Sequence, residues 1–132
     1  MTGKTRRTPA SEAFAYLRMA EEFLAVSQRC LEEGLLRAAG LNAVHAAISA
    51  GDAVCVFEVR ERSSSFRHED AAELLLGSGA PGAREKAAQL SAVLALKNLV
   101  EYESRLLRDG EARTLVKRAS RLVEWASGVL RG

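Results

Sequence analysis

The sequence contains few residues that interrupt a helix. Only two prolines, Pro9 and Pro81, occur in its 132 residues, and aromatic side chains make up 5% of it. No segment shows the alternation of apolar and polar residues that is typical of a half-buried strand. Ala, Leu, Arg and Glu, which all favour helix, dominate the composition. The sequence therefore predicts an all-α fold.

Groups that hold metals, cofactors or disulfides are also scarce. Cys30 and Cys55 are far apart and form neither a disulfide framework nor a metal-binding spacing. The two histidines, 23 positions apart, do not make a metal site by themselves. No glycine-rich phosphate loop or dinucleotide fingerprint is present. We therefore expect no metal and no cofactor.

The sequence also lacks the long apolar runs that would direct a chain to a membrane. The first residues have no apolar stretch of the signal-peptide kind. The longest apolar-rich run, 38–59, is interrupted by Asn42, His45, Asp52 and Glu58. It predicts a core helix rather than a membrane span. Together with the two unpaired cysteines, this indicates a cytoplasmic protein.

The sequence has little excess charge of either sign. Its 19 Lys and Arg residues and 17 Asp and Glu residues give a net charge of +2. This balance does not by itself imply nucleic-acid binding. Lys4, Arg6 and Arg7 make a short basic arm near the N-terminus. We expect 1–8 to be flexible and solvated, and 9–132 to be one helical domain.

Caps, breakers and apolar periodicity divide the domain into five helices. Pro9 suits the first helical position after Thr8, and Gly34 ends or bends that helix. The predicted helices cover 9–33, 35–60, 69–76, 83–107 and 111–130. This pattern predicts an antiparallel bundle of four long helices and one short helix. The alanine-rich second helix is expected at its centre, or at a dimer face.

Four polar residues of the second helix fall on one of its faces. Asn42, His45, Ser49 and Asp52 are spaced by three, four and three positions. One interpretation is that this polar stripe is the solvent face. The other is that it lines a cleft against the helix predicted at 83–107. In a cleft, Asp52 would need a cation or hydrogen-bond donors, because a buried carboxylate is costly.

The helix predicted at 83–107 carries polar residues in its most apolar part. Lys97 and Glu101 are four apart and share a face, as do Asn98 and Tyr102. An ordinary surface ion pair, with Tyr102 packed and its hydroxyl in water, is one interpretation. The other is that these residues complete the cleft.

The segment 97–102 resembles the motif of HEPN domains, which are small helical bundles of toxin–antitoxin, defence and RNA-processing systems. Lys97 stands where that family has its arginine, Asn98 matches its following polar residue, and Tyr102 stands where it has its histidine. An alanine-rich helix with an internal acid, Asp52, also resembles the family. So does a loop that ends in His68 before a short helix with paired leucines. The resemblance covers about 11–130.

The resemblance implies a HEPN-like bundle that forms a homodimer and places Lys97, Tyr102 and Asp52 at a catalytic site. Asn98, Asn42 and His45 would bind the ligand beside them. The implied partners are RNA and a nucleotidyltransferase-type antitoxin. Lysine lacks the planar fork of arginine, and tyrosine titrates near 10. We therefore expect binding of RNA or of a nucleotide-bearing partner between the second and fourth helices, with weak or no catalysis.

Other interpretations remain open. Arg62 and His68, with five residues between them, also satisfy the Arg-to-His spacing, and the serine-rich loop that joins them would suit a phosphate. Alternatively, His68 caps or packs the short helix. For the protein as a whole, the alternatives are a non-catalytic interaction or scaffold module and a divergent metal-independent ribonuclease toxin.

Overall fold

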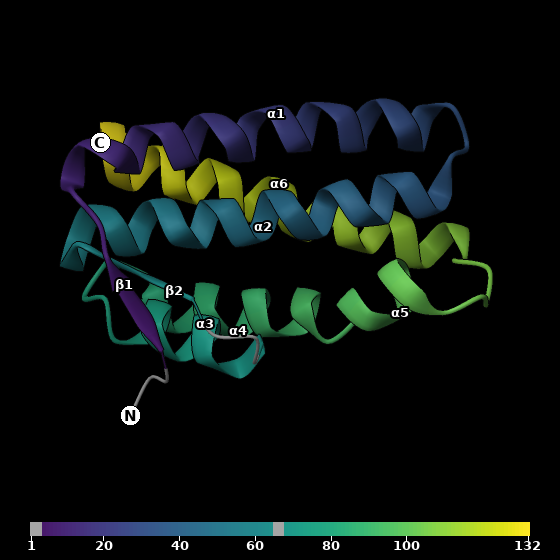
Figure 1. The fold of residues 1–132 in the computed structure, drawn as a ribbon. Coiled ribbons are helices and arrows are strands. Elements are labelled where there is room, and N and C mark those ends of the chain that lie inside the picture. Colours follow the sequence, from purple (N-terminus) through teal and green to yellow (C-terminus); the bar gives the residue numbers. More distant parts are fainter. Residues whose placement is uncertain (1–3, 65–67) are drawn as a thin grey trace.

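The computed structural model describes residues 4–64 and 68–132 and confirms the all-α class (Figure 1). The elements in chain order are β1 Thr5–Arg7, the 3₁₀ helix η1 Ala10–Glu12, α1 Ala13–Glu32, α2 Leu36–Val59, β2 Glu61–Ser63, α3 His68–Leu76, α4 Ala83–Leu94, α5 Lys97–Tyr102 and α6 Asp109–Arg131. The long helices α1, α2 and α6 lie side by side, and α3, α4 and α5 follow α2 on the side away from α1.

Helix α2 is the centre of the core, as its small residues predict. Most of its buried positions are Ala, Gly or Val, so neighbouring backbones approach closely. At Gly40 an added Cβ would lie 2.8 Å from Leu107 Cδ2 and 3.3 Å from Leu115 Cδ1. Ser27 Oγ of α1 donates a hydrogen bond of 2.7 Å to the carbonyl of Ala39. The small side chains therefore set the distances between α2 and its neighbours.

Helix α2 is long and apolar enough to cross a membrane by length and composition alone. However, 67% of its most apolar window is buried inside the protein. That burial is the pattern of a core helix.

The prediction of one helix over 83–107 was wrong. A turn at Ala95 and Leu96 separates α4 from α5, and the chain leaves the helix after Tyr102. Arg37 of α2 explains the end of α5, because its Nη1 donates to the carbonyls of Leu99 at 3.0 Å and Val100 at 2.6 Å. The guanidinium thus binds the Val100 carbonyl, which the amide of a further helical turn would otherwise use, and it shares the Leu99 carbonyl with the amide of Glu103. The bundle has three long helices in its described part rather than four.

Strands β1 and β2 differ from the expectation of a chain without strands. They pair antiparallel, with Thr5 opposite Ser63, Arg6 opposite Arg62 and Arg7 opposite Glu61. Backbone hydrogen bonds from Ser64 to Lys4 and from Thr8 to Arg60 extend the pairing at both ends. Three-residue strands are too short to show an alternating pattern in the sequence, so only the pairing reveals them.

Candidate functional site

The polar stripe of α2 reaches two different neighbours. Ser49 is buried, with 8% of its surface exposed, and Asn42, His45 and Asp52 are half-buried, so the stripe is not a fully solvated face. His45 interacts with Glu101 of α5, whereas Asp52 interacts with Arg62 of β2. These two positions are two helical turns apart, or about 10 Å along the helix. The stripe therefore links two separate polar clusters.

At one end, α2 and α5 meet around Glu101. Lys97 Nζ lies 3.2 Å from Glu101 Oε2, and the two side chains are 24% and 13% exposed. Burial raises the pKa of Glu101, but hydrogen bonds from Lys97 and Tyr102 and the charges of Lys97 and His45 outweigh it and hold the pKa below its ordinary value. Glu101 is thus a carboxylate at neutral pH. We call His45, Lys97, Glu101 and Tyr102 the α5 cluster.

His45 is positioned by α1 as well as by its own helix. Its ring lies 5.3 Å from the ring of Phe23, centroid to centroid, with an angle of 31° between the planes. Phe23 therefore packs against the imidazole, and the charge of His45 is one of the interactions that lower the pKa of Glu101. The structure therefore brings His45 together with Lys97 and Tyr102. Asn42 is different, because its Nδ2 donates to the carbonyl of Ala38 within α2.

The outer side of α5 presents two side chains to solvent. Tyr102 is 74% exposed, in a protein with few aromatics. Asn98 is also exposed, and its Nδ2 donates a hydrogen bond of 3.3 Å to Glu103 Oε2. A phenol ring and an amide are therefore accessible next to the half-buried Lys97.

Arg37 holds α5 and the chain that follows it, and sequence reasoning missed this residue. Besides the carbonyls of Leu99 and Val100, it binds the carbonyl of Arg105 through Nη2 at 2.5 Å. Arg105 in turn forms a two-point pair with Glu111 of α6, at 3.1 and 2.8 Å. This pair lowers the pKa of Glu111 to about 2. Nothing in the local sequence around Arg37 signals these contacts, which cross more than 60 residues.

At the other end of the stripe, Asp52 lies with Arg62 and not with the α5 cluster. Burial raises the pKa of Asp52 to about 7, although the charge of Arg62 opposes this. The Arg62 guanidinium carbon lies 5.7 Å from the centroid of the Tyr16 ring. Its Nε is buried without a hydrogen-bond partner among the described residues. No interaction in the described part links Asp52 to Lys97 or Tyr102, so the three predicted catalytic residues fall into two clusters.

The remaining candidates of the sequence stay predictions. His68 begins α3, but its side chain, like the loop 65–67 before it, lies outside the described part. The phosphate-binding loop predicted there is therefore neither supported nor opposed.

Burial raises the pKa of Cys55 to about 12, so this thiol is unreactive at neutral pH.

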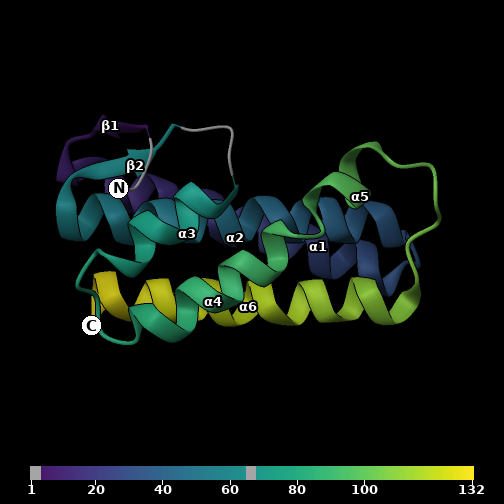
Figure 2. The same ribbon diagram turned by 90° about the horizontal axis from the view of Figure 1, so that it is seen from below.

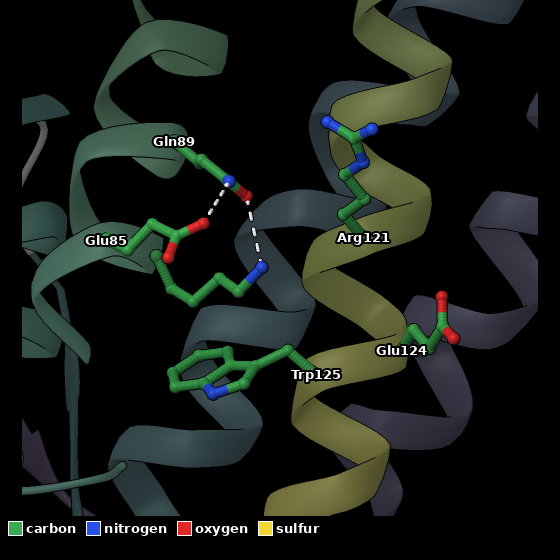
Figure 3. A pocket seen from close by; sticks show the side chains of 6 residues that line it. Glu85, Gln89, Arg121, Glu124 and Trp125 are labelled. Atoms are coloured by element: carbon green, nitrogen blue, oxygen red, sulfur yellow. Dashed lines mark hydrogen bonds between the residues drawn. The ribbon is translucent and has the colours of Figure 1, made fainter. Parts of the chain in front are cut away.

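A separate shallow pocket of about 400 Å³ lies between α4 and α6 (Figure 3). Gln89 hydrogen-bonds both Glu85 and Lys86, and the Trp125 indole donates to the carbonyl of Pro81. Its lining residues carry both signs of charge: Glu85, Lys86, Gln89, Arg121, Glu124 and Trp125. This balance favours no charged ligand, and none of the residues singled out as site candidates in the sequence reaches the pocket.

Within 4–64 and 68–132, no three His, Cys, Asp or Glu side chains gather closely enough to hold a metal ion. The α5 cluster instead provides four polar groups for binding or chemistry: an ammonium, an imidazole, a phenol and one carboxylate.

Neither a protein-family model nor a curated protein matches this chain.

Proposed function

We propose that this protein is a HEPN-like homodimeric domain that binds RNA, or a partner bearing a nucleotide, at the α5 cluster, and that it cleaves RNA weakly or not at all. The observation that carries the proposal is the meeting of α2 and α5 around Glu101. There, Lys97 and Tyr102 of the HEPN-like segment lie with His45 of the polar stripe.

The groups exposed on α5 suit a nucleotide. An accessible aromatic ring such as Tyr102 can stack on a base, an interaction typically worth about 1–3 kcal/mol. Asn98 offers both a donor and an acceptor to a base edge. Lys97 provides a positive point charge for a phosphate. A base and its phosphate could therefore contact the same short helix.

The same geometry supports weak catalysis at most. Lys97 is already paired with Glu101, whose negative charge repels a phosphate in the same place. Asp52, which would be one candidate base, lies in the other cluster with Arg62. Binding therefore needs fewer assumptions than cleavage. A toxin–antitoxin or defence role belongs to this proposal through the family resemblance alone.

The test is binding of a fluorescent single-stranded RNA, with cleavage followed on a gel and the oligomeric state measured by light scattering. We expect a particle of twice 14.3 kDa. Lys97→Ala and Tyr102→Ala should each weaken binding about tenfold, and Tyr102→Phe, which keeps the ring, should bind nearly as the wild type does. Lys117→Ala, at an exposed position on α6, is the matched control.

Each outcome decides between candidates. Wild-type protein that binds no RNA, or a Lys117→Ala loss equal to that of Lys97→Ala, would overturn the proposal. Cleavage abolished by Lys97→Ala or Tyr102→Ala would instead identify a divergent ribonuclease.

A protein-interaction module is the second candidate, and one observation favours it. Leu106 is 85% exposed, four residues after the exposed Tyr102. The short segment 102–106 thus carries two large exposed apolar side chains, and exposed apolar patches mark protein interfaces. If Leu106→Ser abolished the dimer while RNA binding was absent throughout, the interaction module would be the better description.

A further inference from the structure

The excess positive charge of the chain is concentrated in one small element. We call 4–7 and 60–63 the basic ribbon; it consists of β1 and β2 with Lys4 and Arg60 beside them. Five of the 19 cationic residues lie in it, against one of the 17 carboxylates. The remaining 14 cations are outnumbered by 16 carboxylates. Outside the ribbon the protein is therefore slightly acidic.

Pairing within the ribbon places like charges opposite each other. Arg6 faces Arg62 in the register of the two strands. Such a pair is destabilising, and a two-stranded ribbon is marginal in stability by itself. Arg62 turns inward to Asp52 and Tyr16, but Arg6 stays exposed. An anion bound from solvent would relieve this repulsion.

Among the described residues, few carboxylates compensate the exposed cations of the ribbon. Lys4, Arg6, Arg7 and Arg60 are all exposed. Arg7 reaches Glu61 only at 3.8 Å, and its side chain remains 78% exposed. Arg6 and Arg7 lie on the paired strand β1, and backbone hydrogen bonds hold Lys4 and Arg60 beside the two strands. The ribbon is thus a fixed positive surface.

The ribbon and the α5 cluster share one edge of the molecule. In Figure 2 the strands β1 and β2 lie along the same edge as helix α5, at opposite ends of α2. The polar stripe joins them, since Asp52 interacts electrostatically with Arg62 of the ribbon and His45 interacts electrostatically with Glu101 of α5. The ribbon begins directly after Val59, and His45 lies 14 residues before Val59, or about 21 Å along the helix. A single nucleotide is too short to contact both the ribbon and the α5 cluster.

We propose that the basic ribbon binds the phosphate backbone of a single-stranded RNA whose base is held at the α5 cluster. This rests on the proposed function and names its ligand: a polynucleotide rather than a mononucleotide. A single strand fits because a base must be unstacked from its neighbours to stack on Tyr102. The phosphate contacts supply affinity and position, and they make binding depend on salt.

The experiment compares a single-stranded oligoribonucleotide of roughly a dozen nucleotides with adenosine monophosphate over a series of salt concentrations. In the double variant Arg6→Gln/Arg7→Gln, we expect oligoribonucleotide binding to weaken about tenfold at low salt. The slope of log affinity against log salt should fall by about 1.4, since each lost contact on a single strand removes about 0.7. Any binding of adenosine monophosphate should not change.

Two further variants serve as controls for the position of the removed charge and for the charge itself. Lys117→Gln/Arg121→Gln removes the same charge from exposed positions on α6 and should leave affinity and slope unchanged. Arg6→Lys/Arg7→Lys keeps the charge and should retain the wild-type slope. Because Arg6 faces Arg62 and both substituted side chains are exposed, the glutamine variant should be at least as stable as the wild type in thermal unfolding.

The outcomes separate this inference from the function on which it rests. If Arg6→Gln/Arg7→Gln binds RNA with wild-type affinity and slope while Lys97→Ala does not, the ribbon inference is overturned and the proposed function stands. If the wild type binds no RNA, both fail. Binding to phosphatidylserine vesicles instead of RNA, lost in the glutamine variant, would overturn the inference in favour of a membrane surface.

Discussion

The three-helix core and helix α5 are held in place by different kinds of interaction. Leu17, Leu115 and Leu122 are fully buried where α1 and α6 pack on α2, so apolar burial positions the core. Helix α5 buries only Leu99 and Val100, and the hydrogen bonds of Arg37 complete its attachment. Elements with few buried contacts open more readily than a core. The candidate binding surface is thus carried by the less stable part of the molecule.

The core should be most sensitive to a change at Gly40. A side chain there meets Leu107 and Leu115, so Gly40→Val should lower the free energy of unfolding by about 3 kcal/mol through overpacking. Urea denaturation measures this loss. Gly128→Val is the matched control, because no heavy atom beyond its own helix and chain neighbours lies within 4 Å of a Cβ added there. Equal stability of the two variants would contradict the packing argument.

The attachment of α5 should be most sensitive to Arg37. Its guanidinium binds three carbonyls, so Arg37→Ala should cost about 2 kcal/mol, the scale of a few charge-assisted hydrogen bonds. Hydrogen exchange should accelerate in α5 and in 103–108 while α1, α2 and α6 keep their protection. Arg37→Lys should restore little, since lysine has no planar fork. Uniform loss of protection across the molecule would remove the distinction between the two regions.

Asp52 provides a pH-dependent test at the ribbon end of α2. Its folded-state pKa of about 7 lies above its ordinary value of 3.8, so the folded protein holds a proton that the unfolded chain releases. The free energy of unfolding should therefore fall as the pH rises from about 4 to about 7, by about 2 kcal/mol after allowance for solvent. Asp52→Asn should remove this decline.

The control for Asp52 is Glu124→Gln, which removes an exposed carboxylate from α6. Denaturation at several pH values compares the three proteins. An Asp52→Asn profile that follows the wild type would show that Asp52 is fully solvated.

The smallest effect on stability is expected at the Lys97–Glu101 pair. Glu101→Gln should change the free energy of unfolding by less than about 1 kcal/mol, as is usual for a pair near the surface. RNA binding should nevertheless strengthen about threefold, because a negative charge next to the phosphate is removed and Lys97 is released. Glu85→Gln on α4 should change neither quantity. Weaker binding in Glu101→Gln would mean that Glu101 positions Lys97 rather than competing with the phosphate.

Local patterns in the sequence determined the all-α class, the central position of α2 and the shared face of Lys97 and Glu101. Helical period and residue spacing carry this information, because residues three or four apart meet on one helix whatever surrounds it. The polar stripe of α2 was also readable in this way. Which neighbours the stripe would meet was not readable, because that depends on how the helices pack.

Only the tertiary structure decided where the predicted helix 83–107 breaks, that Arg6 pairs with Arg62, and that His45 joins Glu101 while Asp52 joins Arg62. Each of these depends on contacts between segments far apart in the sequence, such as the hydrogen bonds of Arg37 to Leu99 and Val100. The two residues that form such a contact are not related by any regular spacing in the sequence. The interaction energies of these contacts stabilise the fold only after the apolar core has brought the two segments together.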